Sequence, residues 1–255
     1  MRTGSIIFVI IALCMVACAH KSGHNNRPQT NPHSNRSEMG NTQQSKVTSS
    51  NCRNLDVIVS NNRGERNKLD GSKIFAKYNT AVFIVFTSDD YKGYQGSGFF
   101  INSDGLAVSN YHVFQGTHIG TEQIKLADSE KVYKVVEVIH SDVNEDFILF
   151  RVSASNTNFI PIANFKPQVG EKVYAIGSPR GLKNTFSSGE VSQWRDKNLM
   201  QISALIDHGS SGGVLINEYG EAVGITSGSF ADGSQANLNY AWSIDVVKPY
   251  LNCHL

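Results

Sequence analysis

The sequence has little net charge and few charged side chains. Its 23 Lys and Arg residues nearly balance its 22 Asp and Glu residues, so the formal charge is +1, and only 18% of the residues are charged. Domains that bind nucleic acid usually carry a basic excess, so we expect no nucleic-acid partner. No apolar run reaches the roughly 20 residues that a membrane-spanning helix needs. The 255 residues suffice for one sizeable domain, or two small ones, with extensions.

The N-terminus carries the features of an export signal. A basic residue precedes an uncharged apolar run over residues 6–16, which is too short to cross a bilayer and is typical of a secretory signal peptide. Two processing routes are open: cleavage after Ala19, or lipidation of Cys18, because residues 15–18 resemble the bacterial lipobox. A cysteine directly after the short apolar run favours lipidation, with residues 1–18 as the signal peptide.

Lipidation would decide where the protein resides. Several acyl chains on Cys18 would hold it stably on a membrane, which a single chain would not. We therefore expect a protein of the bacterial cell envelope whose folded part lies in the periplasm. The alternative is secretion without an anchor. Alanine after the cysteine resembles the pattern of outer-membrane lipoproteins.

A polar tether is predicted over residues 19–55. This segment is rich in Asn, Ser, Gln, Thr, Lys and His and has almost no apolar side chains, so it cannot bury enough surface to offset its ordering entropy. Its irregularly spaced histidines are interpreted as solvated linker residues, with weak metal binding as the alternative. We expect the protein to need neither a metal nor an organic cofactor.

Cysteine is scarce, and its placement is informative. Beyond the leader only Cys52 and Cys253 remain of the four cysteines, and they bracket the globular region almost end to end. In an exported chain such a pair favours a disulfide. The alternative is two separate surface thiols.

The globular part, residues 70–250, is predicted to be all-β with short terminal helices. A short amphipathic helix is expected over residues 71–78, and a short C-terminal helix with Asp245 as its N-cap. Hairpin turns are expected at residues 102–105 and 217–220, each with a glycine where positive φ is needed. Residues 161–170 are read as the link between two β subdomains, at about 70–155 and 168–250. Short runs bounded by turn residues predict strands at 81–86, 98–101, 106–109, 132–139, 147–152, 173–176, 199–204, 214–216, 222–226 and 240–244.

A serine among glycines is the strongest chemical signal. Ser211 lies in residues 207–213, where the flanking glycines would leave its hydroxyl accessible and let a carbonyl approach the backbone. A serine hydroxyl needs a base, and a histidine suits that task. A carboxylate can then orient the imidazole and stabilise the imidazolium that forms. His112 and Asp146 are the candidates, and both lie upstream in the first predicted subdomain.

Four collinear motifs resemble the HtrA/Deg branch of the trypsin-like serine proteases. The resemblance spans roughly residues 74–247 and implies two six-stranded antiparallel β-barrels of the chymotrypsin type, packed side by side, with His112, Asp146 and Ser211 as the catalytic triad. It also implies an oxyanion hole made by the backbone N–H groups of Gly209 and Ser211. The four motifs are residues 96–113 with the histidine, 146–152 with the aspartate, 175–192 with a Gly-x-Pro-x-Gly loop, and 209–213 with the serine.

The same resemblance indicates the substrate-binding residues. Thr226, Ser227 and Gly228 would line the primary specificity pocket and pair with an extended substrate. Leu205 occupies the position where trypsin-type enzymes carry an aspartate at the pocket floor. We therefore expect a small or aliphatic residue before the scissile bond, and not Lys or Arg.

Several alternatives and departures accompany this assignment. Asp142 or Glu145 could orient the histidine in place of Asp146, and Ser210 is the rival nucleophile. The sequence is expected to have no PDZ domain, which HtrA proteins usually carry. Val214 replaces the usual proline after the Gly-Gly pair, and Tyr111 replaces a smaller residue and could crowd the cleft. His118 and His140 are expected at the surface or at strand ends, and His208 near the pocket.

The sequence thus predicts an exported, membrane-tethered serine endopeptidase that acts on unfolded or extended polypeptides. Two other classes stay open. One is a protein with the protease fold that binds peptides without turnover. The other is a lipoprotein with a mainly structural role.

Overall fold

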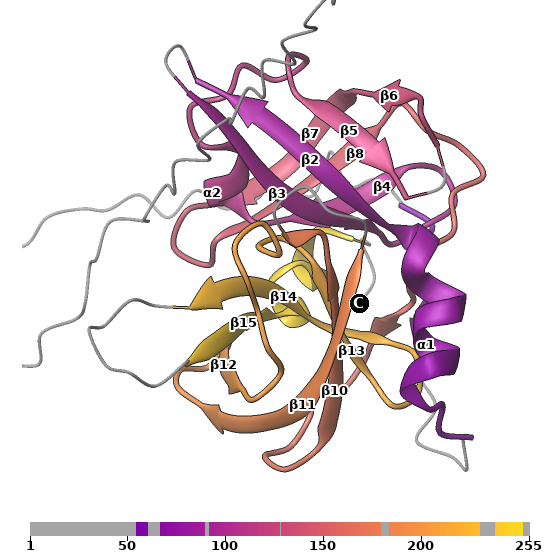
Figure 1. The fold of residues 1–255 in the computed structure, drawn as a ribbon, viewed down its shortest axis with the longest axis vertical. Coiled ribbons are helices and arrows are strands. Elements are labelled where there is room, and N and C mark those ends of the chain that lie inside the picture. Colours follow the sequence, from indigo (N-terminus) through magenta and orange to yellow (C-terminus); the bar gives the residue numbers. More distant parts are fainter. Residues whose placement is uncertain are drawn as a thin grey trace, which may run out of the picture.

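The computed structural model describes residues 55–60, 67–89, 92–127, 129–179, 184–229 and 238–251. Two β-sheets form two lobes, one above the other in Figure 1. The first sheet runs in the order β6-β5-β2-β3-β4-β8-β7 and is antiparallel throughout. Its strands are β2 (Val82–Ser88), β3 (Gly93–Phe100), β4 (Leu106–Ser109), β5 (Gln123–Leu126), β6 (Val132–Tyr133), β7 (Val135–Asp142) and β8 (Phe147–Val152).

The second sheet contains a closed barrel. β14 pairs with both β13 and β15, so that β14, β13, β10, β11, β12 and β15 form a ring of antiparallel strands. The two-residue strands β1 and β9 extend it through parallel pairings. The strands are β1 (Val59–Ser60), β9 (Ile162–Ala163), β10 (Lys172–Gly177), β11 (Thr185–Trp194), β12 (Leu199–Ile202), β13 (Val214–Asn217), β14 (Ala222–Ser229) and β15 (Asn239–Ser243).

The predicted all-β pair of subdomains is confirmed, with one refinement. The second sheet closes with six strands, as expected for a barrel. The first curls without closing: among the described residues no pairing joins its edge strands β6 and β7. In the part of the chain that the structure describes, the two lobes are therefore not equivalent, and β6 and β7 are the edge strands of the first.

Helix α1 (Gly71–Tyr78) matches its prediction at both ends. Asp70 is its N-cap and accepts a hydrogen bond from the Lys73 N–H at 2.9 Å, as expected for a capping carboxylate. The hydroxyl of Ser72 and this N–H lower the pKa of Asp70 to about 2. The helix buries Ile74 and Tyr78 and runs beside the second lobe, although it precedes the first in sequence (Figure 1).

Both predicted hairpin turns are confirmed, and in both an asparagine side chain accepts hydrogen bonds from two backbone N–H groups. Asn102 Oδ1 accepts hydrogen bonds from the backbone N–H groups of Asp104 and Leu106. Asn217 Oδ1 accepts from those of Tyr219 and Glu221. The glycine that completes each turn has a φ of +73° at position 105 and +79° at position 220.

The structure corrects two details. The C-terminal 3-10 helix (Ile244–Val246) is capped by Ser243, whose Oγ accepts from the Asp245 N–H, so Asp245 lies inside the helix and is not its N-cap. The link over residues 161–170 does contain a strand, β9, too short to show periodicity; Ile162 pairs with Val59 on one side and Ala222 on the other.

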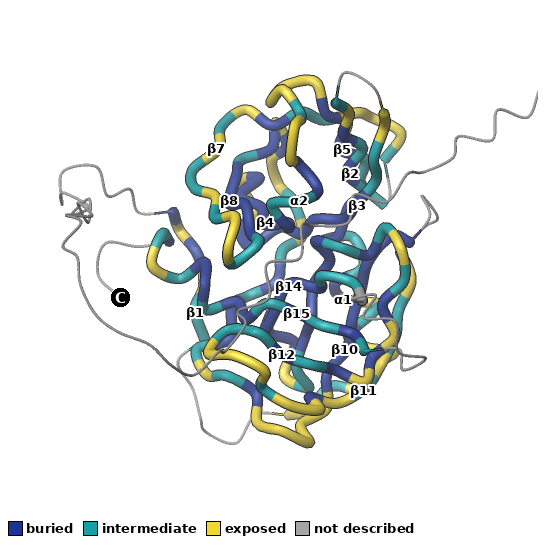
Figure 2. The backbone as a smooth tube through the Cα atoms, turned by 90° about the vertical axis from the view of Figure 1, so that its left-hand side faces the viewer, coloured by how far each residue is buried: buried dark blue, intermediate teal, exposed yellow. Residues whose placement is uncertain are grey.

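Three apolar clusters fill the molecule, and Figure 2 shows in dark blue the buried parts of the chain, to which their core residues belong. The largest lies between the sheets, because it combines Phe147 and Leu149 of β8 with Ile176 of β10 and Ile225 of β14. The other two lie within the individual lobes. Core packing thus joins the two lobes directly. In the described part of the chain, no helix is long and apolar enough to cross a membrane.

Candidate active site

His112 and Asp146 form a bonded pair at the edge of the first lobe. His112 lies in the one-turn helix α2 (Tyr111–Phe114), and Asp146 ends the turn between β7 and β8. The ring Nδ1 of His112 lies 2.8 Å from Asp146 Oδ2, and the backbone N–H of His112 donates to Oδ1 at 2.9 Å. The side chains are 24% and 17% exposed, so solvent and substrate can reach the ring. The carboxylate holds the imidazole with Nε2 directed away from it.

Asp146 is fixed by both lobes. Its φ of +45° lies in the left-handed region, which Asp adopts more readily than most residues. From the first lobe, the Asn110 side chain donates to the Asp146 carbonyl at 2.8 Å. From the second lobe, the Ser227 hydroxyl donates to Oδ2 at 3.0 Å. Ser227 is the extra residue of a β-bulge in β14, and bulges of this kind redirect a side chain.

The loop that carries Ser211 is held by hydrogen bonds from two buried residues, Ser97 and Thr226. The Ser97 N–H donates to the Ser211 carbonyl and the Ser97 hydroxyl to the Gly209 carbonyl, each at 2.8 Å. The Thr226 hydroxyl donates to the Ser210 carbonyl at 2.7 Å. Ser210 itself is buried, whereas Ser211 is partly exposed. Accessibility therefore favours Ser211 over Ser210 as the reactive serine.

Gly212 brings this loop against the segment that leads into α2. Its φ is +85°, and a Cβ there would lie 2.2 Å from the Ser97 carbonyl oxygen and 3.1 Å from the Asn110 nitrogen. No side chain fits such a space. Since Asn110 is two residues from His112 and Gly212 is next to Ser211, the close approach places the two segments side by side.

The Ser211 hydroxyl faces β14. A Cβ built on Gly228 would lie 3.4 Å from Ser211 Oγ, and Gly228 follows the Ser227 that is bonded to Asp146. Within the described residues, Ser211 Oγ makes no hydrogen bond, and the His112 ring is bonded to Asp146 alone. The backbone N–H groups of Gly209 and Ser211 also donate no hydrogen bond in this part of the chain, so both are available to a ligand.

The predicted specificity residues have different surroundings. Leu205 is 65% exposed, and its carbonyl accepts from the Ser187 hydroxyl at 2.8 Å. Thr226 is buried, its hydroxyl is bonded to Ser210, and its N–H and carbonyl bond to Gly213 and Gly212. Gly228, which follows the bulge, lies close to the Ser211 hydroxyl and pairs with Tyr240 of β15.

The rival carboxylates contact other groups. Asp142 Oδ1 accepts from the N–H groups of Asn144 and Glu145. Glu145 Oε1 accepts from the Asn198 side chain at 2.5 Å. Among the described contacts, the carboxylate on His112 is that of Asp146.

The remaining histidines lie in other surroundings. His140 stacks on Tyr250, with ring centroids 3.7 Å apart, and His208 is exposed. His118 is exposed, as expected for a surface residue, and its carbonyl accepts from the hydroxyl of Thr121. In the described part of the chain, no group of three His, Cys, Asp or Glu residues is placed to hold a metal ion.

Two residues of the site were missed by the sequence analysis. Ser97 and Asn110 are both fully buried, and each is hydrogen-bonded to a backbone carbonyl of the site. Ser97 has a signal in the sequence, since it lies between two glycines, whereas Asn110 lies between Ser109 and Tyr111 and has none. Only the fold shows which carbonyls they reach. Cys18, Cys52 and Cys253 lie outside the described residues.

Comparison with known proteins agrees with this architecture. The family model described as a trypsin-like peptidase domain matches residues 96–225, a span that includes His112, Asp146 and Ser211. Serine protease HTRA2, mitochondrial, of Drosophila ananassae is 32% identical over 184 residues, covering 68% of this chain and 42% of that protein. Its counterpart in Drosophila virilis is 31% identical with the same coverage. The chain thus spans less than half the length of these curated relatives.

Two solved structures show the same fold. The serine endoprotease of Yersinia pestis superposes with a TM-score of 0.63 at 26% identity, covering 72% of this chain and 65% of that one. The HtrA-type protease AlgW, solved with a tripeptide, gives a TM-score of 0.62 at 20% identity, covering 71% and 62%. The second likeness concerns the fold alone. With the family match and the relatives, it follows that the chain belongs to the trypsin-like peptidases, in their HtrA branch.

Proposed function

We propose that the protein is a serine endopeptidase in which Ser211 is the nucleophile, His112 the general base and Asp146 the residue that orients the base. The observation that carries this proposal is the contact of His112 Nδ1 with Asp146 Oδ2 at 2.8 Å. It leaves the other ring nitrogen to accept a proton from a neighbouring hydroxyl.

Each step of peptide hydrolysis then has a group to perform it. Ser211 Oγ attacks the scissile carbonyl carbon while its proton passes to His112 Nε2. The negative charge that develops on the carbonyl oxygen is stabilised by the N–H groups of Gly209 and Ser211. His112 next protonates the leaving amine, which departs and leaves an acyl-enzyme. Water, deprotonated by His112, attacks the ester and releases the second product.

A fluorophosphonate probe tests the assignment. We expect it to label wild-type protein and Ser210→Ala, and to fail with Ser211→Ala. Ser211→Ala should also lower kcat by about 10⁶-fold, because the triad residues act as a unit. Ser210→Ala is the matched control, since it removes the neighbouring hydroxyl. Peptide binding without labelling of the folded wild-type protein would instead support a binding protein.

The proposed substrate is an extended polypeptide with a small or aliphatic residue before the scissile bond. Leu205 offers no negative charge to a basic side chain, and Gly228 of β14 lies close to the Ser211 hydroxyl, where we expect the main chain of an extended segment to pair. Peptides that differ only at this position measure the preference through kcat/KM. Preferred cleavage after Lys or Arg would contradict it.

We also propose that the protein is exported and lipid-anchored at Cys18, with the protease part in the periplasm. The support is the apolar run of residues 6–16 followed by the lipobox-like segment. Mass spectrometry of the mature N-terminus should show an acylated Cys18. Cys18→Ala should release the protein from the membrane fraction, and an unmodified mature N-terminus at residue 20 would favour secretion.

A further inference from the structure

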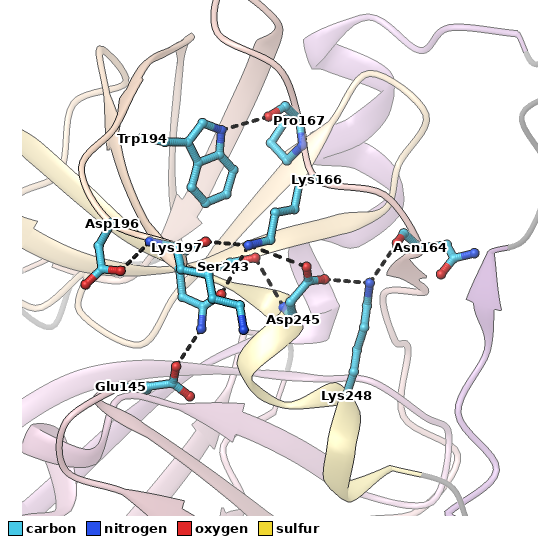
Figure 3. Close-up of polar contacts among 11 residues, drawn as sticks. Glu145, Asn164, Lys166, Pro167, Trp194, Asp196, Lys197, Ser243, Asp245 and Lys248 are labelled. Atoms are coloured by element: carbon cyan, nitrogen blue, oxygen red, sulfur yellow. Dashed lines mark hydrogen bonds and ion pairs between the residues drawn. The ribbon is translucent and has the colours of Figure 1, made fainter. Parts of the chain in front are cut away.

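A second bridge joins the two lobes directly beside Asp146. Glu145, the preceding residue, extends from the β7–β8 turn of the first lobe toward a polar cluster of the second, as Figure 3 shows. Its Oε1 accepts a hydrogen bond from the Asn198 side chain, with Nδ2 at 2.5 Å. Asn198 lies in the turn between β11 and β12, 53 residues away in sequence.

The amide of Asn198 is held in one orientation by opposite charges. Its Nδ2 faces the Glu145 carboxylate, and its Oδ1 accepts from the ammonium of Lys166 at 3.1 Å. Because a carboxylate only accepts and an ammonium only donates, a rotated amide would lose both bonds. The backbone of Asn198 is fixed as well, since the N–H of Ser243 donates to its carbonyl at 2.7 Å.

The cluster is anchored further within the second lobe. Lys166 lies in the link between the lobes, 3.8 Å from the carboxylate of Asp245 and over the ring of Trp194. Asp245 also pairs with Lys248 at 2.6 Å. The link, the β11–β12 turn and the C-terminal 3-10 helices therefore meet in one network, and Glu145 is its contact with the first lobe (Figure 3).

The left-handed backbone of Asp146 requires such support. A non-glycine residue in this region persists only when its surroundings determine it. The carboxylate has one link to the second lobe, through Ser227, and Glu145 supplies an adjacent one through Asn198. Two links on consecutive residues prevent the β7–β8 turn from rotating about either link.

We propose that the Glu145–Asn198 bridge is a positioning device for the active site, which holds Asp146 so that its carboxylate stays on His112. This inference rests on the proposed function, because it assigns the bridge a role in the same triad. Among the described contacts, neither side chain bonds to His112 or to Ser211. The bridge acts through Asp146 alone.

Kinetics of matched variants test the bridge. Glu145→Ala and Asn198→Ala should each lower kcat about tenfold, because small displacements of a catalytic group are costly, while KM stays unchanged. The double variant should be no worse than either single one, since both remove the same contact. Glu145→Gln should retain activity, because its amide oxygen still accepts from Asn198. Asp196→Ala is the control: it lies in the same turn, and its carboxylate accepts from the Lys197 N–H.

An NMR measurement tests the effect of the bridge on the His112–Asp146 contact independently of catalytic activity. The proton on His112 Nδ1 should give a downfield NMR resonance that disappears in His112→Ala and Asp146→Asn. We expect it to weaken or broaden in Glu145→Ala and Asn198→Ala, and to persist in Glu145→Gln and Asp196→Ala. A cooperative thermal transition in each variant is the control that it is folded.

Two results would overturn different claims. An unchanged kcat and an unchanged resonance in Glu145→Ala, with Ser211→Ala inactive, would refute the bridge and leave the proposed function intact. Full hydrolysis by Ser211→Ala would refute the proposed function, while the resonance would still report on the bridge. Equal losses in Asp196→Ala and Glu145→Ala would also refute the bridge, since they would reflect a general effect of altering this turn.

Discussion

Ser97 contributes more contacts to the reactive loop than its place in the sequence suggests. It is fully buried, its backbone N–H and its hydroxyl donate to the Ser211 and Gly209 carbonyls, and its Oγ accepts from the Ser178 N–H at 2.9 Å. These bonds fix the orientation of the peptide that follows Gly209. A fixed Gly209 carbonyl in turn limits how the adjacent loop can rotate.

Ser97→Ala should therefore affect both stability and catalysis. We expect a loss of about 1–3 kcal/mol in the free energy of unfolding, because the buried Ser178 N–H loses its acceptor and the Gly209 carbonyl loses its shorter hydrogen bond. We also expect kcat to fall with little change in KM, since the loop that presents Ser211 is loosened. Denaturant unfolding and peptide hydrolysis measure the two effects.

Thr157→Val supplies the comparison for Ser97→Ala. It also removes a hydroxyl bonded to a backbone carbonyl, that of Asn102 at 3.0 Å, but in a loop of the first lobe outside the site. A similar loss of kcat in both variants would mean that Ser97 acts through general stability only.

At the scale of single residues, the sequence predicts which types of residue form the site better than it predicts which of them contact each other. A glycine-flanked serine, a histidine and a carboxylate before an apolar strand can be read from the sequence itself. Which of three nearby carboxylates faces His112 cannot, because Asp142, Glu145 and Asp146 are neighbours with the same charge. The turn geometry directs Asp142 to backbone N–H groups and Glu145 to Asn198.

At the scale of elements, β7 and the C-terminal 3-10 helix (Lys248–Tyr250) meet through aromatic stacking. The ring of His140 on β7 lies parallel to that of Tyr250, and Phe147, next to Asp146, packs against both. Burial lowers the pKa of His140 from its ordinary value of 6.5, against the opposing charge of Asp142. Burial, followed by the charges of Asp142 and Glu145, raises the pKa of Tyr250.

This contact should make stability depend on pH. Between the lowered pKa of folded His140 and 6.5, the unfolded chain binds the proton more readily, so the stack contributes fully above about pH 6.5 and loses strength as pH falls through the folded pKa. We expect the melting temperature to fall on acidification from pH 8 to pH 5. The decrease should be smaller in His140→Phe, which keeps the stack without the charge. Parallel curves for the two proteins would contradict this role.

Strands with a continuous apolar pattern could be predicted from the sequence, and strands without one could not. β4 and β8 agree with the sequence at both ends, because each is a buried and strongly apolar run. β5 and β9 were missed: Ile124 is the one buried residue of β5, and β9 has two residues. β11 was found only through family resemblance, since one of its ten residues is buried. Pairing with neighbouring strands, and not local pattern, makes these segments extended.

At the scale of the whole molecule, the two ends of the described chain meet. The Leu55 N–H donates to the Leu251 carbonyl at 3.4 Å, and the Asn102 side chain donates to the Leu55 carbonyl at 2.9 Å. Both leucines belong to the cluster between the sheets. Leu55 lies three positions after Cys52 and Leu251 two positions before Cys253, so the described chain brings the two ends close to each other. The disulfide itself stays a prediction, because both cysteines lie outside the described residues.

A Cys52–Cys253 bond should stabilise the protein considerably. In the chain-entropy model a loop of this length contributes up to about 5 kcal/mol. Non-reducing mass spectrometry should find the linked peptides, and reductant should lower the melting temperature of wild-type protein. Cys52→Ser should melt like the reduced wild type and be insensitive to reductant. A reductant effect of equal size in Cys52→Ser would rule the bond out.

The sequence by itself determined the class of the fold and the candidates for the reactive groups, because strand pattern, turn residues and a serine among glycines are local properties. Only the tertiary structure decided which residues these groups contact within the chain. His112 and Asp146 are 34 positions apart, Asp146 and Ser227 are 81 apart, and Ser97 and Gly209 are 112 apart. Contacts at such separations depend on how the two lobes pack. The closed second barrel, the open first sheet and the Glu145–Asn198 bridge between them follow from that packing.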